Sequence, residues 1–388
     1  MKFPLFKVHT DKTLALKNLE EVLDSGFLNE GEWVIELEKQ FKKYFDFNNL
    51  LAVNSCTSAL TLALKISGVQ NGDDVLTTSM TCVATNMPIC SLGANPIWVD
   101  IKRDTGNIDF KNLQKSITKK TKALICVNWA GYPCELIELN KFCQDNGIKL
   151  IQDAAHSFGS AYKGKQVCHY SDFTCYSLQA IKHITSGDGG ILTCKDEKDF
   201  KRAKSLKWFG IDRESSKDER GEWKGQRWEA DIKEPGYKFH MNNVSAAIGL
   251  SQIPHLEIII NSHRKNALLY ERFLSDNDFL SFLSKPSECN PSYWVFTILL
   301  DEKINRDNVL QSLNDAGIGA GVVHIPNHNY SCFSENIKDL PETDYFSKHQ
   351  ISLPCGWWLN TNEINLISNN LLDIIKNEYN KHYWEKIL

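Results

Sequence analysis

The sequence predicts an α/β fold in which a mostly parallel sheet is accompanied by a smaller α+β unit. Between residues 50 and 195, short apolar runs alternate with helix-length segments, which is the pattern of βαβ units and a parallel sheet. After a polar stretch at 212–236, the chain continues with amphipathic helices and only a few apolar runs. A length of 388 residues accommodates one large domain and a smaller one.

Apolar runs bounded by polar or turn residues mark the expected strands of the large domain: 50–55, 73–78, 95–101, 122–129, 149–155, 173–178 and 189–194. Apolar residues at helical spacing predict helices over 57–68 and 135–147. A long helix is expected over 244–274, with a kink at Pro254. In the small domain, 292–300 and 319–325 read as strands.

These elements suggest three parts of the chain. Residues 1–30 form an N-terminal segment expected to pack with the small domain, residues 31–255 form the large α/β domain, and residues 256–388 form the small α+β domain.

Charge and hydropathy exclude several classes of partner. The net charge of −4 and the isoelectric point of about 6.3 give no basic field for nucleic acid or acidic lipid. The longest apolar stretches are too short to cross a bilayer, and the first residues lack the apolar region of a signal peptide. We therefore expect a cytoplasmic enzyme that binds neither nucleic acid nor membrane.

Twelve cysteines raise the question of a metal or disulfide framework. No pair has the C-x-x-C spacing, and no cysteine cluster faces a pair of histidines. Several lie inside apolar strands, where a reduced cysteine behaves as a small hydrophobe. We expect structural thiols and no metal, with a metal or iron–sulfur site as the lesser alternative.

Residues 54–60, NSCTSAL, place hydroxyl side chains between an apolar strand and a helix. Backbone N–H groups and the helix dipole favour an anion at such a turn, and Thr57 and Ser58 add hydroxyl donors. The same pattern is typical of a simple helix N-cap, so the segment alone leaves both interpretations open.

Residues 151–157, IQDAAHS, end an apolar strand with an acidic side chain. In open α/β sheets this edge is where ligands bind, and Asp153 is placed to pair with a protonated ring nitrogen such as that of pyridoxal 5′-phosphate (PLP). By themselves, Asp153 is also typical of a helix cap and His156 of a structural histidine.

Residues 177–190, SLQAIKHITSGDGG, set Lys182 between an apolar strand and a glycine-rich turn, with Ser177 five residues before it. Lysine forms Schiff bases with aldehyde cofactors, although a lone lysine here is also typical of a solvated surface. Taken together, an anion-ready helix start, a carboxylate and a lysine in this order are what a PLP enzyme requires.

The sequence resembles the sugar-nucleotide aminotransferases of the DegT/StrS type, a branch of the fold-type-I PLP enzymes. The likeness runs nearly end to end and rests on the order of many stretches: GFLNEGEWVIELEKQF, NSCTSALTLAL, MTCVATN, NPIWVDI, TGNID, QDAAHSFGS, YSLQAIKHITSGDGG, GYKFHMNNVSAAIGLSQ, VVHIPNH and ISLPCG. It implies an aspartate aminotransferase-like fold with a mostly parallel seven-stranded sheet and helices on both faces.

The resemblance also assigns roles to residues. Lys182 would be the Schiff-base lysine and Asp153 the partner of the pyridinium, with His156 near the phenolic oxygen. Thr57, Ser58 and Ser177 match the phosphate contacts. The family is dimeric with shared active sites, and the stretch 236–243 corresponds to the segment that crosses over, so Lys238 or His240 would reach the partner's phosphate.

Two positions depart from the family pattern. Cys82 stands where many members carry an aromatic residue that stacks on the pyridoxal ring. Stacking must then come from Cys82 itself or from elsewhere, with Trp129 as one candidate. Lys238 stands where many members have asparagine.

The leading function is transfer of an amino group, from glutamate by family analogy, to a keto-sugar linked to a nucleotide, for surface polysaccharide or glycoconjugate biosynthesis. The cofactor would alternate between PLP and pyridoxamine phosphate (PMP). The alternatives are a cyclitol or other non-nucleotide ketone as substrate, a PLP-dependent sugar dehydratase, and a PLP-binding regulatory protein. Dehydratase relatives replace the lysine with histidine, whereas this sequence keeps Lys182.

The candidates for substrate contacts lie in the polar excursion, in a turn of the small domain and at one tryptophan. The excursion at 212–236 carries Arg213 and further arginines and tryptophans that suit a nucleotide diphosphate, and it also suits a subunit contact or a solvated loop. His324 lies in HIPNHN, a plausible substrate-facing turn from the small domain, and Trp129 is a further candidate.

Overall fold

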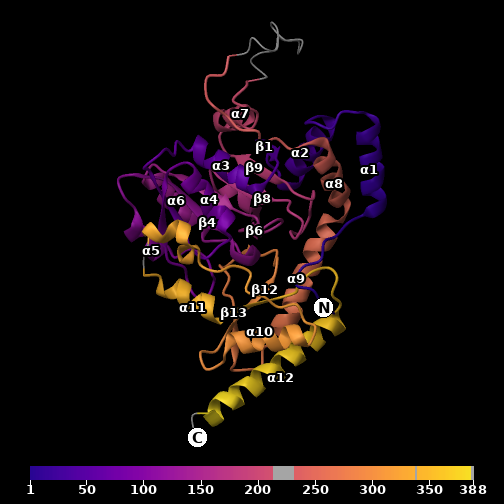
Figure 1. Cartoon of the computed structure of the whole chain (residues 1–388), viewed down its shortest axis with the longest axis vertical. Coiled ribbons are helices and arrows are strands. Elements are labelled where there is room, and N and C mark those ends of the chain that lie inside the picture. The colour runs from indigo at the N-terminus through magenta and orange to yellow at the C-terminus, as the bar shows by residue number, and fades with distance from the viewer. Residues whose placement is uncertain (213–230, 337–338, 386–388) are drawn as a thin grey trace.

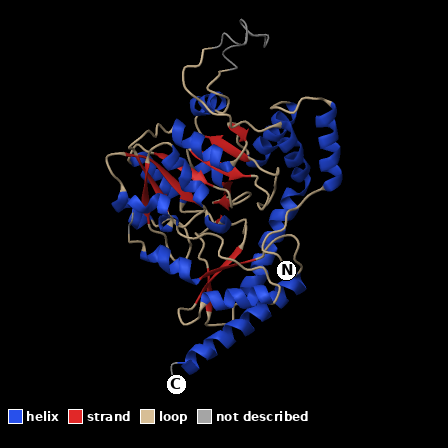
Figure 2. Cartoon of the chain, viewed as in Figure 1, coloured by secondary structure: helices blue, strands red, loops and turns tan. Residues whose placement is uncertain are grey.

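The large part of the molecule is a central sheet with helices on both faces, and a smaller sheet lies beside the long helices near the C-terminus (Figure 1, Figure 2). The computed structural model describes residues 1–212, 231–336 and 339–385. The large sheet has the strand order β1-β9-β8-β5-β4-β2-β3. Its strands are β1 (Leu50–Val53), β2 (Asp74–Thr78), β3 (Asn95–Val99), β4 (Thr121–Val127), β5 (Lys149–Asp153), β8 (Phe173–Ser177) and β9 (Gly190–Cys194).

All neighbouring pairs in this sheet are parallel except the two that β9 makes, with β1 and with β8. The predicted α/β class and the mostly parallel seven-stranded sheet are therefore confirmed. All of the expected large-domain strands form, within a few residues of their predicted ends. This agreement reflects the strong signal of short apolar runs in a sheet that is covered on both faces.

Alternate residues of each strand enter two different cores. On β1, Leu50 and Ala52 join one core, and Leu51 and Val53 join the other. The first core packs under helices α2 (Glu32–Phe45) and α6 (Leu136–Asp145), and the second under α3 (Cys56–Ile66), α4 (Val83–Ser91) and α7 (Glu197–Leu206). Apolar side chains on both faces make the sheet the rigid support of its loops.

The long helical stretch after residue 243 is interrupted where the sequence predicts. Helix α8 (Asn243–Gln252) is followed by the short turn η4 (Ile253–His255) and by α9 (Leu256–Phe273). Pro254 lies inside η4, and its missing N–H and ring prevent a continuous ladder of hydrogen bonds. The predicted kink is confirmed.

The small part contains a three-stranded sheet in the order β10-β12-β13. Its elements are β10 (Leu280–Phe282), β12 (Phe296–Leu300), β13 (Gln350–Leu353), α10 (Arg306–Asp315), α11 (Pro341–His349) and α12 (Thr361–Glu385). The remaining elements are α1 (Lys12–Asp24), α5 (Phe110–Ser116), η1 (Trp129–Gly131), β6 (Ala161–Tyr162), β7 (Lys165–Gln166), η2 (Val167–Tyr170), β11 (Cys289–Asn290), η5 (Asn327–Asn329) and η6 (Ser331–Asn336).

One strand prediction is wrong. The segment 319–325 makes only an isolated bridge, between Gly321 and Ser352, and is not a strand. The reason is a close approach of the N-terminal segment, because Gly319 donates its N–H to the carbonyl of Phe3 and a side chain at Gly319 would overlap that backbone. Strand β12 pairs instead with β13, which is not among the strands expected from the sequence.

The N-terminal segment contacts both parts of the chain. Phe3 is buried in the core of the small part and bridges Ile318. Helix α1 lies beside α8 (Figure 1), where Asn18 donates a hydrogen bond to the carbonyl of Ala247 at 3.1 Å. The division of the chain into 1–30, 31–255 and 256–388 remains a prediction.

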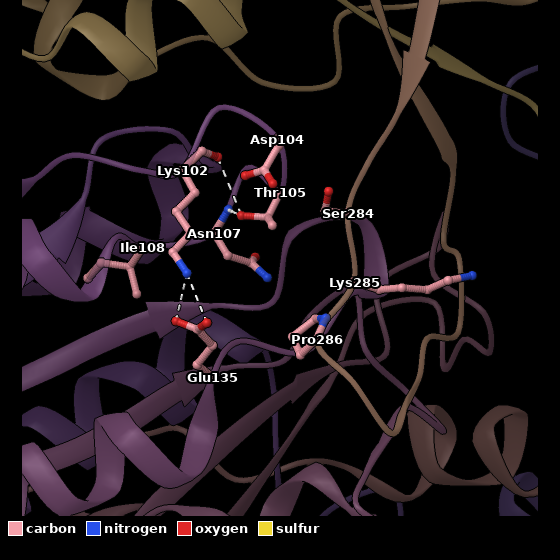
Figure 3. A pocket seen from close by; sticks show the side chains of 9 residues that line it. All are labelled: Lys102, Asp104, Thr105, Asn107, Ile108, Glu135, Ser284, Lys285 and Pro286. Atoms are coloured by element: carbon pink, nitrogen blue, oxygen red, sulfur yellow. Dashed lines mark hydrogen bonds and ion pairs between the residues drawn. The ribbon is translucent and has the colours of Figure 1, made fainter.

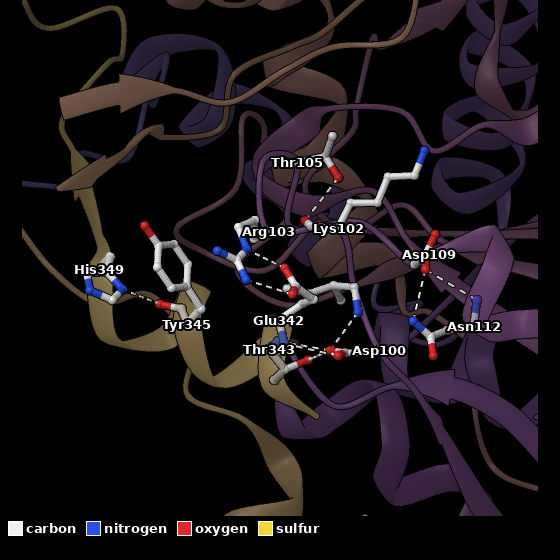
Figure 4. Close-up of polar contacts among 11 residues, drawn as sticks. Asp100, Lys102, Arg103, Thr105, Asp109, Asn112, Glu342, Thr343, Tyr345 and His349 are labelled. Carbon is white, nitrogen blue, oxygen red and sulfur yellow. Dashed lines mark hydrogen bonds and ion pairs between the residues drawn. The ribbon is translucent and has the colours of Figure 1, made fainter. Parts of the chain in front are cut away.

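The two parts are joined by a helix cap that crosses between them (Figure 4). Asp100, which follows β3, accepts the backbone N–H groups of Glu342 and Thr343 and the Thr343 hydroxyl, all at the start of α11. Arg103 pairs with Glu342 and lies over the ring of Tyr345 at 4.2 Å from its centroid. A buried carboxylate of the large part thus fixes the position of a small-part helix.

Candidate active site

The predicted site residues gather at the carboxyl ends of the parallel strands. Asp153 ends β5, Ser177 ends β8, Lys182 follows β8 in a loop, and Cys82 precedes α4 shortly after β2. The carboxyl ends of neighbouring parallel strands lie side by side at this edge of the sheet, as in other open α/β folds. The topology therefore brings together side chains that are far apart in the sequence.

Asp153 is a buried carboxylate with a fixed orientation. One oxygen accepts the hydroxyl of Thr85 at 2.7 Å and the other accepts the backbone N–H of Ala155 at 3.0 Å. Burial raises the pKa of Asp153, while these two hydrogen bonds and the charge of Lys182 act in the opposite direction. A carboxylate held in this way is suited to a cationic partner that completes its environment.

Lys182 contributes an amine whose pKa is lowered to about 8, because burial disfavours the ammonium form. The negative charge of Asp153 near it acts in the opposite direction. The Lys182 Nζ lies 3.6 Å from the ring centroid of Trp294, a residue of the small part. An amine with a lowered pKa is a better nucleophile and base near neutral pH than a solvated lysine.

His156 lies in an aromatic stack beside Lys182. Its ring is 4.0 Å from that of Trp294 at an interplanar angle of 16°, and 5.3 Å from that of His324 at 9°. The two histidine Nε2 atoms are 3.4 Å apart. Burial and the charge of Lys182 lower the pKa of His156 well below its usual value and that of His324 to about 3, so both rings are neutral.

The start of α3, where the sequence predicts an anion site, lies next to β8 and β9. Ser55 caps the helix by accepting the N–H of Ser58 at 3.1 Å, and the hydroxyl of Ser58 donates to Asn54. A side chain at Gly190 would overlap the backbone of Ser55, so β9 approaches the start of α3 directly. Ser177 pairs with Gly190 in the ladder, which places Ser177 near Thr57 and Ser58.

Lys238 and His240 lie beside the same edge of the sheet. The carbonyl of Lys238 accepts the Asn54 side-chain amide at 3.3 Å, while its side chain is exposed. His240 pairs with Val53 in an isolated bridge and shares a 2.7 Å hydrogen bond with Asn29 of the same chain. Their predicted reach to the phosphate of a second subunit remains a prediction.

Trp129 is placed differently from the other candidates. It is only 1% exposed and packs edge-on against His324 and Phe346, with ring centroids 5.7 Å and 5.3 Å apart. Its ring lies behind the histidine pair, whereas Trp294 lies beside Lys182. Arg213 and the other charged or aromatic candidates of the excursion at 213–230 lie outside the described residues.

Sequence reasoning missed three residues of the site: Cys56, Thr85 and Trp294. The sulfur of Cys56 lies 4.0 Å from the carboxylate of Asp153. Thr85 had a usable signal, since it follows the strand-ending segment MTC by one helical turn. No local pattern marks Trp294, because its contact with Lys182 is made across the junction of the two parts.

A separate cavity of about 160 Å³ lies away from these residues (Figure 3). Its lining includes Lys102 and Glu135, which pair with each other at 2.9 Å, and Lys285, which pairs with Glu271. None of the predicted catalytic or cofactor-binding side chains lines this cavity. Because the predicted side chains lie elsewhere, and Lys102, Glu135 and Lys285 are already paired, this cavity is not the candidate active site.

Comparison with known proteins identifies the family. The model of the DegT/DnrJ/EryC1/StrS aminotransferase family matches residues 9–372. The chain belongs to this family. The predicted family, fold and enzyme class are thereby confirmed.

Two similar proteins are named for the biosynthesis of a polysaccharide and of pseudoaminic acid. The spore coat polysaccharide biosynthesis protein SpsC of Bacillus subtilis is 29% identical over 373 residues, 93% of this chain and 94% of its own. Helicobacter pylori PseC, an aminotransferase involved in the biosynthesis of pseudoaminic acid, is 28% identical with a TM-score of 0.88, covering 97% of this chain and 100% of its own.

The sugar aminotransferase Spr1654 of Streptococcus pneumoniae, named as putative, has been solved in a PMP form and a PLP form. The PMP form is 27% identical with a TM-score of 0.88, over 96% of this chain and 99% of its own. The PLP form is 25% identical with the same TM-score, over 97% and 99%. The DegT/DnrJ/EryC1/StrS aminotransferases use PLP, and this chain is a PLP-dependent aminotransferase.

The residues present fit this cofactor. His156 has a buried Nδ1 atom for which no hydrogen-bond partner is found among the described residues, as expected of a group that awaits a ligand atom. Lys182 would hold the aldehyde carbon, Asp153 the ring nitrogen, and the start of α3 with Ser177 the phosphate. When bound, the cofactor supplies an electron sink for the amino-acid carbon.

Among the described residues, no helix is long and apolar enough to cross a membrane. In the same part of the chain, no group of three or more histidine, cysteine, aspartate or glutamate side chains could hold a metal ion. All twelve cysteines are free thiols.

Proposed function

We propose that this aminotransferase transfers the amino group of glutamate to the ketone of a nucleotide-linked deoxysugar, in the synthesis of a surface polysaccharide or glycoconjugate. The observation that carries the proposal is that buried Lys182 and Asp153 lie close enough to influence each other's pKa at the carboxyl edge of the sheet, beside the capped start of α3. The relatives SpsC and PseC, named for polysaccharide and pseudoaminic acid synthesis, support the choice of a sugar.

In the proposed reaction, Lys182 is the base. Its neutral amine would take the proton from Cα of the donor amino acid and deliver it to C4′ within the same half-reaction, and in the second half-reaction it would move a proton in the opposite direction, to the sugar carbon. Asp153 holds a positive ring nitrogen in place, because its carboxylate is fixed by Thr85 and Ala155. His156 and His324 are neutral and act as hydrogen-bonding groups, with no role as cations.

We further propose that the enzyme acts in the cytoplasm as a homodimer with shared active sites. The exposed side chain of Lys238 lies near the start of α3 through the hydrogen bond of its backbone to Asn54, which supports a role at the phosphate of a neighbouring subunit.

A spectroscopic experiment tests the proposed function. Purified protein loaded with PLP should show the visible absorption of a lysine-bound aldehyde, and glutamate should convert it to the spectrum of the amine form. Keto-sugar nucleotides should restore the first spectrum faster than cyclitol ketones do. Lys182→Ala should abolish the glutamate response, and an active Lys182→Ala enzyme would contradict the proposed role of this residue.

The outcomes separate the alternatives. Restoration by a cyclitol ketone alone would assign a non-nucleotide substrate. Release of water from the sugar without net amino transfer would assign a dehydratase. A protein that binds PLP but does not respond to any amino donor would fit a regulatory protein and overturn the proposal.

A further inference from the structure

Trp294 is the one aromatic side chain recorded in cation–π contact with the amine of Lys182, among the contacts of the described residues. The Nζ atom lies 3.6 Å from the ring centroid, within the distance at which an indole face attracts an ammonium group. Trp294 precedes β12 in the small part, whereas Lys182 follows β8 in the large part. The contact therefore joins the two parts at the reacting group.

The indole ring of Trp294 is held rigidly. Its Nε1 donates to the carbonyl of Ile181 at 2.8 Å, and its backbone N–H donates to the carbonyl of Ala130 at 2.9 Å. Its ring stacks with that of Phe6, at 4.9 Å between centroids and 21° between planes, and with that of His156, at 4.0 Å and 16°. A ring fixed by four neighbours pays little conformational entropy when it holds an amine.

The backbone around Trp294 is strained in a way that fixes this position. Tyr293 has a φ of 50°, which is uncommon for a bulky residue, and Ala130 opposite it has a φ of 51°. A side chain at Gly131 would lie 2.7 Å from the Ser292 hydroxyl and 2.9 Å from the carbonyl of His156. Three segments thus meet closely where Trp294 enters the site.

Other titratable groups face Lys182 from several elements. Asp153 comes from β5, and its charge favours the ammonium, while the thiols near the amine are Cys56 from α3, whose pKa burial raises, and Cys82 from the start of α4. The neutral histidines near the amine are His156, His183 and His324. The indole of Trp294 adds an aromatic contact with Nζ to these neighbours.

We propose that Trp294 is a positioning residue that holds the free amine of Lys182 during the part of the cycle in which Lys182 is not bonded to the cofactor. The inference rests on the proposed role of Lys182 as the base. The indole face keeps the amine close to the site, ready to accept or return the substrate proton, and the ring's electrostatic field stabilises its ammonium form.

The test compares Trp294→Phe, which keeps an aromatic face, with Trp294→Leu, which removes it at similar volume. Both variants lose the Nε1 hydrogen bond to Ile181, so a difference between them measures the effect of the aromatic face on the Lys182 amine. Trp129→Leu is the matched control, since it removes a buried indole that packs on the same histidine pair without reaching Nζ.

The first readout is the pKa of the Lys182 amine in the cofactor-free protein. Brief acetylation across a pH series, followed by peptide mass spectrometry, gives the rate of modification at Lys182. We expect the pKa in Trp294→Leu to be about half a unit to one unit below that in Trp294→Phe. Equal pKa values in the two variants, or the same shift in Trp129→Leu, would overturn the proposal.

The second readout is the pH profile of the glutamate half-reaction in the PLP-loaded enzyme. The acid limb should move to lower pH in Trp294→Leu relative to Trp294→Phe, and the limiting rate should fall about tenfold because the amine is less well placed. A variant with a reduced rate and an unmoved limb would show a structural role only. If the wild-type enzyme does not respond to glutamate, the proposed function fails. The labelling experiment still tests whether the Trp294 ring stabilises the ammonium form of Lys182.

A third measurement does not depend on the folding of Trp294→Leu. Biosynthetic incorporation of fluorinated tryptophan keeps the shape of every indole and weakens the negative charge of its face. It should lower the pKa of Lys182 in the wild-type sequence and leave it unchanged in Trp294→Phe. An equal change in both proteins would contradict the contact.

Discussion

Lys182 lies in surroundings that oppose its charge, and this has a consequence for stability. Burial lowers its pKa from 10.5 to about 8 in the folded protein, so folding is disfavoured wherever the amine is charged. Below about pH 8 both folded and unfolded chains carry the proton, and the penalty is complete. Between about pH 8 and 10.5 the folded chain holds fewer protons, so its stability rises with pH until the penalty is gone.

We therefore predict that Lys182→Met stabilises the cofactor-free protein. The gain should be largest below about pH 8 and should vanish as the pH approaches 10.5. Thermal unfolding of both proteins across this pH range is the measurement, with Lys238→Met as a control at an exposed lysine. A stabilisation that does not depend on pH would contradict the electrostatic cause.

At the scale of elements, the turn η1 governs how the segments behind the site fit together. Gly131 has a φ of 96°, and a Cβ there would lie 2.7 Å from the Ser292 hydroxyl, 2.8 Å from the N of Tyr293 and 2.9 Å from the carbonyl of His156. The neighbouring Ala130 carbonyl accepts the N–H of Trp294. A side chain at Gly131 must therefore displace the segment that carries Trp294.

We predict that Gly131→Ala lowers the free energy of unfolding by about 3 kcal/mol or more, because backbone strain and steric overlap add. Gly147→Ala is the matched control, since Gly147 also has a positive φ of 65° but open space around it, and should cost roughly 1–2 kcal/mol. Denaturant unfolding of both variants decides. Equal losses would mean that the overlap is relieved without cost.

Helices, strands and caps were predictable from the sequence to the extent that their signals are local. The apolar runs of the large sheet, the break at Pro254 and the hydroxyl residues at the start of α3 all act through neighbouring residues, and the structure contains each of them. The segment 319–325 failed as a strand: Gly319 at its start donates its N–H to Phe3, from the far end of the chain, and Gly321 makes only an isolated bridge to Ser352.

The candidate site shows the same division. Strand β5 ends at Asp153 and β8 ends at Ser177, with Lys182 in the loop that follows β8. Because these strands are neighbours in a parallel sheet, the three side chains come to the same edge. The packing of Trp294 against Lys182 depends on how two parts of the chain dock, and no pattern along the sequence encodes that geometry. The burial of Trp129 behind the histidines is likewise a property of packing.

For the whole molecule, one of the contacts that join the two parts is made by a buried carboxylate (Figure 4). Asp100 caps α11 across the junction, while Asp109 caps α5 (Phe110–Ser116) within the large part by accepting two backbone N–H groups. The segment that precedes α11 contacts the site edge, where His328 donates its N–H to Ser79 and shares a second hydrogen bond with it.

We predict that Asp100→Ala both destabilises the protein, by about 2 kcal/mol, and raises KM for the keto-sugar. Asp109→Ala should cost about 1 kcal/mol and leave KM unchanged, because its cap is local. Unfolding free energies and steady-state kinetics of the two variants make the comparison. A raised KM in Asp109→Ala would show that loss of stability alone explains the effect.

The proposed sharing of active sites is also a property of the assembly. Lys182→Ala and Lys238→Ala should each be inactive or impaired, yet a refolded equal mixture should recover activity at about a quarter of its sites, since half of the dimers are mixed and each has one intact site. Activity of the mixture compared with either parent measures this. No recovery would place Lys238 in the site of its own chain.

The pairing of β1 with β9 has a consequence for synthesis of the chain. Leu50–Val53 can complete its ladder only with Gly190–Cys194, so the start of α3 meets the loop that carries Lys182 only after both have left the ribosome. A contact between segments so far apart in the sequence is slow to form. Until it forms, the backbone groups of β1 lack their strand partner. Capture of the cofactor is therefore a late event in biogenesis, and a shortage of vitamin B6 would act on nascent enzyme as well as on its chemistry.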